Sequence, residues 1–227
     1  MNTLEKTYYH TKTILTHKKE VAKICFKFGL YWQGIIHDFS KFSPTEFISS
    51  VRYYQGNRSP IEAEKEDKGF SMAWLHHKSR NKHHFWYWVD YNSKQVQTPV
   101  RIPLKYVYEL FADTVAAGRV YSKNSGKNWK QSDPYEYYKT HNRNAKNGIE
   151  FMEYCTKAVL DNMYVDMMNY GLSYVVESVK NKKYEKFYNN KKTNDGKEIL
   201  EWNSDYRNLV EKYYTNSEEN DYGEKRS

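Results

Sequence analysis

The sequence predicts an all-α protein, and three observations support that class. Apolar residues recur at helical spacing in several long segments, helix start signals precede some of them, and almost no segment alternates as a strand does. The chain of 227 residues, with 39% hydrophobic and 17% aromatic residues, is long enough to form a sizeable core. We therefore expect a globular helical protein.

In the first part of the chain, the apolar stripe of the first helix contains Ile14, Val21, Ile24 and Phe28. Ser43-Pro44-Thr45-Glu46 reads as a capping box that starts a helix, and residues 57–69 read as a polar loop. The helices expected here cover residues 8–28, 31–39, 44–55 and 71–90.

In the second part, a helix is expected to begin at Pro103 and to run to about residue 121. Two more are expected near residues 135–141 and over 149–179, and the amphipathic piece 199–214 is expected to pack on the body. We divide the chain into a helical domain over residues 1–145, a helical extension over 146–215 and a disordered tail over 216–227.

The net charge and the cysteine content limit the expected class of binding partner and the expected cellular compartment. The net charge of +8 favours an anionic partner, without choosing among nucleotides, nucleic acid and acidic surfaces. Cys25 and Cys155 belong to no CxxC spacing, which fits a reducing cytoplasm. No signal peptide and no apolar run of about 18 residues is present, so no membrane partner is expected.

The histidines are the most informative residues, because seven of the eight lie before residue 85. His17 falls on the apolar stripe of the first helix, and the pair His37-Asp38 ends an apolar run. Asp113 lies among small residues, in FADTVAAG. Buried imidazoles and carboxylates need partners, and one divalent cation satisfies several of them together. Mn, Fe, Co, Ni or Zn suits such a donor set.

Four further histidines, His76, His77, His83 and His84, crowd the predicted helix 71–90. On an unbroken helix, His77 shares a face with His84, and His76 with His83. Asn81 would relax this limit if the helix broke there. The competing interpretation is an exposed basic helix, which the aromatic residues around the histidines oppose because they demand burial.

These residues resemble the HD-domain superfamily of metal-dependent phosphohydrolases, an all-α fold. HDFSK, residues 37–41, is similar to its HD-x-x-K segment, and FADT to its late aspartate. The blocks LTHKKEV, GIIHDFSKFSPTEF, WLHHKSRNKHHFWYW and DPYEYY resemble an uncharacterised bacterial and phage family of this type, over roughly residues 8–145.

The resemblance implies an HD-like helical bundle with additional C-terminal helices. It implies that four side chains bind one metal ion: His17, His37, Asp38 and Asp113. A second ion would be held by His77 with His84 or His83, and Asp38 would bridge the two ions. Both histidines lie on one predicted helix, whereas in two-metal members they come from separate helices, so one or two ions remain open.

We expect hydrolysis of a nucleotide or another small phosphoester by a metal-activated water. Lys41, Arg80 and Lys82 are the candidate phosphate contacts. Lys41 and His83 are the candidate catalytic residues; whichever of His76 and His83 is not a ligand would serve as general acid or base.

Two other functions compete with hydrolysis. One is a di-iron oxygenase of the same fold. The other is a non-enzymatic nucleic-acid-binding protein that uses lysines and the exposed aromatics Tyr184, Phe187 and Tyr188, although no nucleic-acid-binding motif supports it. The aromatic content also suits a homodimer.

Overall fold

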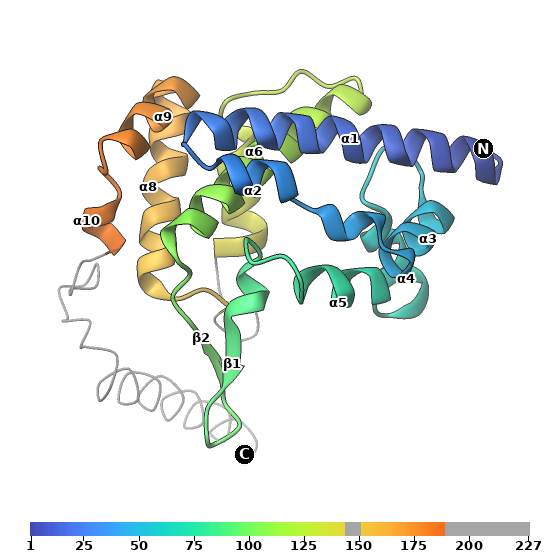
Figure 1. Ribbon diagram of the computed structural model, residues 1–227, viewed down its shortest axis with the longest axis horizontal. Helices are drawn as coiled ribbons and strands as arrows, with labels where there is room; N and C mark the ends of the chain where they lie inside the picture. The colour runs from blue at the N-terminus through green and yellow to red at the C-terminus, as the bar shows by residue number, and fades with distance from the viewer. Residues whose placement is uncertain (144–150, 189–227) are drawn as a thin grey trace, which may run out of the picture.

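The computed structural model describes residues 1–143 and 151–188, and this part of the chain is all-α apart from one short hairpin (Figure 1). The prediction of an all-α fold is confirmed. The α-helices are α1 (Thr3–Lys27), α2 (Tyr31–Ile36), α3 (Pro44–Tyr53), α4 (Pro60–Lys68), α5 (Met72–Lys78), α6 (Leu104–Asn124), α7 (Asp133–Tyr138), α8 (Tyr154–Tyr170), α9 (Leu172–Lys180) and α10 (Glu185–Tyr188).

Short elements connect these helices. The 3-10 turn η1 (Phe39–Phe42) follows α2, and the 3-10 turn η2 (Phe85–Trp88) directly precedes the hairpin. A π-helical turn, η3 (Lys139–Arg143), follows α7. The strands β1 (Val89–Tyr91) and β2 (Gln97–Pro99) pair antiparallel. The sequence analysis did not predict this hairpin.

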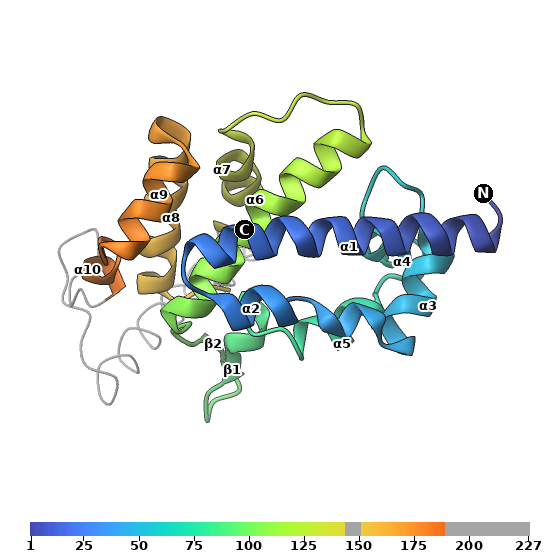
Figure 2. The same ribbon diagram turned by 45° about the horizontal axis from the view of Figure 1, so that its top comes forward.

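The long helix α1 packs against α2 and α3 on one side and against α6 on another (Figures 1 and 2). The approach of α1 and α2 requires a glycine, because a Cβ atom on Gly34 would lie 2.8 Å from Cε1 of Phe26 and 3.1 Å from Cβ of Cys25. This contact places the end of α2 beside the middle of α1, where His17 lies.

One hydrophobic core joins α1, α6, α8 and α9. Phe111 of α6 is fully buried, and its ring lies 5.0 Å from that of Tyr164 on α8. The core continues to Tyr184, so in the described residues the segment after 150 packs on the same core as α1 and α6. The boundary at residue 145 stays a prediction, while residues 199–214 and 216–227 lie outside the described residues.

The structure corrects several predicted elements. Residues 57–69 are not simply a loop, because Pro60 starts α4 and Gly69, at φ 78°, ends it. The helix over 149–179 is two helices separated by Gly171, at φ 85°. The helix over 71–90 ends at Lys78, and the Asn81 side chain donates to the carbonyl of His77 (2.8 Å) and to Ser40 Oγ (2.7 Å).

The aromatic residues assigned to nucleic-acid stacking are not an exposed platform. Tyr184 is fully buried and donates its hydroxyl to Asp166 (2.8 Å), and Phe187 and Tyr188 pack against the core. Their apolar area is therefore used in folding. No helix of the described residues is long and apolar enough to cross a membrane.

Candidate metal centre

A cluster of buried histidines and carboxylates lies where α1, α5, α6 and the turn after α2 meet. The middle of α1 contributes His17, the turn contributes His37 and Asp38, and α6 contributes Asp113. His77 comes from the last turn of α5, and His83 and His84 follow after the break in the chain. The structure thus brings together all six residues predicted as ligands, and His83 with them.

The first group of donors contains His17, His37, Asp38 and Asp113, and its four ligand atoms lie within 4.8 Å of one another. Nε2 of His17 is 2.9 Å from Oδ1 of Asp113, and Nε2 of His37 is 3.5 Å from the same oxygen. Two imidazoles and two carboxylates face a common point, as the ligands of one metal ion do.

The second group contains Asp38, His77, His83 and His84, again within 4.8 Å of one another. Nε2 of His77 lies 3.3 Å and Nε2 of His83 lies 3.4 Å from Oδ1 of Asp38. On an unbroken helix His77 and His83 would face apart, but that limit does not apply here, because α5 ends at Lys78. The role of His83 as a general acid or base stays a prediction, and its position is that of a ligand.

Asp38 belongs to both groups and directs a different oxygen toward each. Oδ1 faces His77 and His83, whereas Oδ2 lies 3.4 Å from Nε2 of His37. Its backbone is left-handed, at φ 53° and ψ 25°, a conformation that costs a non-glycine residue free energy and that clusters at functional sites. This turn aims one buried carboxylate at two sets of imidazoles.

Several of these donor atoms are buried without a hydrogen-bond partner among the described residues. They are Nε2 of His37, His83 and His84, and Oδ1 of Asp38, whereas Nε2 of His17 lies 2.9 Å from Oδ1 of Asp113. Unpaired burial of several polar atoms is costly, and all four belong to the two groups. A bound divalent cation would satisfy them together, so the residues present fit a metal ion.

Two buried glutamates contact Nδ1 of the histidines and orient the rings. Neither was predicted as a site residue from the sequence. Glu109 Oε1 lies 2.9 Å from Nδ1 of His37 and 3.2 Å from Nδ1 of His83. Glu46 lies 2.6 Å from Nδ1 of His76 and 2.8 Å from Nδ1 of His77. A carboxylate that accepts from Nδ1–H fixes the tautomer and turns the Nε2 lone pair toward a metal.

Signals for these glutamates exist in the sequence. Glu109 precedes Asp113 by four residues and therefore shares its face of α6. Glu46 was interpreted only as part of the capping box, which is half right. The Ser43 side chain accepts from the Glu46 amide (3.4 Å), but the Glu46 carboxylate turns to His76 and His77.

The cluster is electrostatically balanced by cations. Burial by itself would raise the pKa of Asp38, but His37, Lys41 and His77 hold it well below its usual range. Burial would lower the pKa of His37, yet the surrounding Asp38, Asp113 and Glu109 raise it to about 10. The buried carboxylates thus favour positive charge, which a proton on His37 supplies and a metal ion would supply in its place.

The predicted phosphate contacts divide into two kinds. Lys41 Nζ lies 2.6 Å from Oδ2 of Asp38 and so adjoins the first group. Arg80 is exposed and donates to Ser79, while Lys82 lies over the rings of Tyr87 and Tyr106. Among the described residues, no side-chain hydrogen bond or ion pair joins Arg80 or Lys82 to the cluster. A lysine that was not predicted, Lys18, donates to the carbonyls of His37 and Ile35 (3.4 Å to Ile35) and holds the turn.

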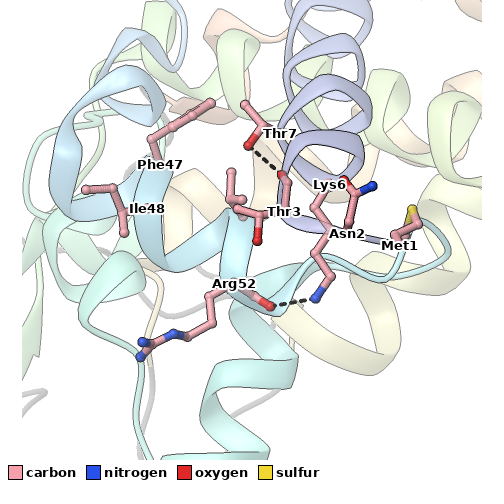
Figure 3. A pocket seen from close by; sticks show the side chains of 9 residues that line it. Met1, Asn2, Thr3, Lys6, Thr7, Phe47, Ile48 and Arg52 are labelled. Carbon is pink, nitrogen blue, oxygen red and sulfur yellow. Dashed lines mark hydrogen bonds between the residues drawn. The ribbon is translucent and has the colours of Figure 1, made fainter.

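A hollow of about 510 Å³ lies elsewhere. It lies between the first turns of α1 and the later turns of α3 and is lined by Thr3, Lys6, Phe47 and Arg52, among others (Figure 3). Lys6 donates to the carbonyl of Arg52 (3.0 Å) there. The hollow contains none of the candidate ligands, so the cluster is the better site.

A family model described as a family of unknown function (DUF5662) matches residues 6–166. The match covers the cluster, from His17 on α1 to Asp113 on α6. No curated protein and no solved structure matches the chain. The resemblance to the HD-domain superfamily stays a prediction.

Proposed function

We propose that this chain, which belongs to the family of unknown function DUF5662, is a metal-dependent phosphohydrolase of the HD type. Its substrate would be a nucleotide or another small phosphoester. The observation that carries the proposal is the buried Asp38, whose two oxygens face two donor groups with unpaired Nε2 atoms.

Two metal positions, bridged by Asp38, account for the cluster better than one. A single ion in the first group would leave Nε2 of His83 and His84 buried without a partner. An ion in the second group would satisfy those atoms. The separate elements that supply His77 and His83 also remove the objection that both lie on one helix.

The donor sets differ, and this bears on metal identity. The first group offers two imidazoles and two carboxylates, whereas the second offers three imidazoles and the shared Asp38. Imidazole suits Zn, Fe and Ni, while carboxylate also suits Mn. We propose Mn, Fe, Co, Ni or Zn, with the harder ion in the first position.

Metal ions at these positions would lower the pKa of a bound water and polarise a phosphoryl oxygen. Glu109 would hold one imidazole of each group in the ligand tautomer. Lys41, already 2.6 Å from Asp38, would contact the phosphoryl group on the side of the first position. With His83 among the ligands, His76 would be the general acid or base, oriented by Glu46. Because Cys25 and Cys155 are buried thiols, we place the activity in a reducing cytoplasm.

A di-iron oxygenase is the second candidate, and the three imidazoles of the second group favour it. Such a site would contain two iron ions per chain and show the optical band of a mixed-valent pair. A hydrolase would act without oxygen and would accept several divalent metals. Activity measured anaerobically with Mn or Zn therefore separates the two functions.

Metal analysis of purified wild type, Asp38→Ala and Asp90→Ala tests the proposal. Asp90 is exposed on β1 and is the matched control. We expect one to two transition-metal ions per chain in wild type and Asp90→Ala after reconstitution, and close to none in Asp38→Ala. A panel of nucleotides, phosphomonoesters and phosphodiesters then identifies the substrate. A wild type that holds no transition metal after reconstitution would refute the proposal.

A further inference from the structure

A large apolar surface lies next to the cluster and remains exposed in the described residues. It comprises the outward side chains of α2 and η1, which we call the α2 patch: Tyr31, Trp32, Ile35, Ile36, Phe39 and Phe42. These side chains are 38–70% exposed. Tyr31 and Ile35 are four residues apart on α2, so they lie on the same face of that helix.

We propose that the α2 patch is the interface of a homodimer, in which two copies of this chain pack patch against patch. The size of the patch supports this occupant. Taking about 200 Å² for each side chain, the exposed fractions amount to roughly 700 Å². A stable interface buries about 800 Å² per partner, of which roughly 60% is apolar. The α2 patch alone supplies that apolar area.

The chemistry of the patch also suits a second copy. An interface with two-fold symmetry brings each residue near its own equivalent, so any charge on it repels itself. The chain carries a net charge of +8, yet α2, YWQGII, has no charged residue. The charged residue of η1, Lys41, is paired with Asp38 (2.6 Å). The aromatic side chains on the patch are of the kind that is enriched at the centres of protein interfaces.

A membrane surface is a poorer occupant. Helices that lie on membranes carry a long apolar face and a polar face rich in lysine and arginine. The helix α2 has six residues and none of these cations. Its short, flat face matches a protein partner better.

The dimer would also enclose the turn that carries the site. His37 and Asp38 lie in the chain between Ile36 and Phe39, and both are buried beneath the patch. The two chains would therefore meet over the outer side of the metal centre.

Sedimentation velocity on the full chain at about 50 μM tests the proposal, with wild type, Trp32→Glu and Leu4→Glu. Leu4 is 82% exposed on the first turn of α1, outside the patch, and serves as the control. We expect wild type and Leu4→Glu at twice the mass of one 27.3 kDa chain, and Trp32→Glu at that of a single chain with an unchanged helical circular dichroism spectrum.

Cross-linking through an introduced cysteine is the second measurement. Cys25 and Cys155 are buried, so Ile35→Cys adds one accessible thiol at the centre of the patch. We expect Ile35→Cys to form covalent dimers under mild oxidation and Leu4→Cys to remain a single chain. A monomeric wild type, or dimers that persist in Trp32→Glu, would overturn the proposal. So would a monomer that co-sediments with phosphatidylserine vesicles through Trp32.

Discussion

The two faces of α6 differ in what they need to be stable. One face turns Glu109 and Asp113 toward the histidine cluster, and the other buries Phe111 and Val115 against the apolar core. The apolar face is fully packed, because the ring of Phe111 contacts the rings of Tyr164 and Phe28. The polar face leaves imidazole nitrogens without partners. One helix thus joins a region that is stabilised by apolar packing to a region whose donor atoms could bind cations.

The largest effect should come from breaking the apolar face. Phe111→Ala removes a fully buried ring and should lower the free energy of unfolding by about 3–5 kcal/mol, measured by urea denaturation. Phe70→Ala, at a half-exposed ring, is the control and should change it little. The folded fraction of Phe111→Ala should bind as many metal ions as wild type. A lower metal content in that folded fraction would show that the two faces are not separable.

Metal removal tests the polar face. A ligand at a hundred to a thousand times its dissociation constant stabilises the folded state by about 3–4 kcal/mol. A chelator should therefore lower the melting temperatures of wild type and of Phe111→Ala. The loss in free energy of unfolding should be similar for the two proteins. It should leave Asp38→Ala unchanged, because both donor groups use Asp38. Equal sensitivity of Asp38→Ala would contradict the shared-carboxylate arrangement.

Variants of the glutamates that contact the histidines test whether the cluster has two separate metal positions. Glu109→Gln should weaken metal binding at both positions by about 10–100-fold, since Glu109 contacts His37 and His83. Glu46→Gln should weaken the second position alone, through His77. Cobalt(II) titration followed by visible absorption resolves the two steps.

Glu64→Gln is the matched control for both glutamates, because Glu64 is buried against Ser71 and Lys68, away from the ligands. Its titration should match that of wild type. Identical effects of Glu46→Gln and Glu109→Gln on both steps would argue against separate roles.

The smallest effect is expected at Lys18, which holds the turn from the side of α1. Burial lowers the pKa of Lys18, and its ammonium donates to the carbonyls of His37 and Ile35. Lys18→Met should cost about 1 kcal/mol of unfolding free energy and weaken metal binding several-fold. Lys19→Met, at an exposed neighbour, should change neither quantity. Metal binding as tight as in wild type would show that the turn holds its shape without Lys18.

Much of the fold followed from local signals. The apolar stripe that ends at Phe28 and the proline before the late helix placed α1 and α6 within a few residues. The errors fell where local signals were short or where a distant contact intervened. The helix α5 ends at Lys78, and the side chain of Asn81 donates to Oγ of Ser40, which lies 41 residues earlier. No periodicity of the segment 71–90 contains that contact.

By itself, the sequence determined that buried histidines and aspartates need partners. The resemblance to the HD-domain superfamily then identified the candidate ligands His17, His37, Asp38, His77, His84 and Asp113. Only the tertiary structure decided how they group. The left-handed turn at Asp38, the break after Lys78, and the placement of Glu46 and Glu109 behind the rings each depend on packing between distant segments. A pattern along one helix records which face a residue lies on, but the residue opposite that face is set by the fold.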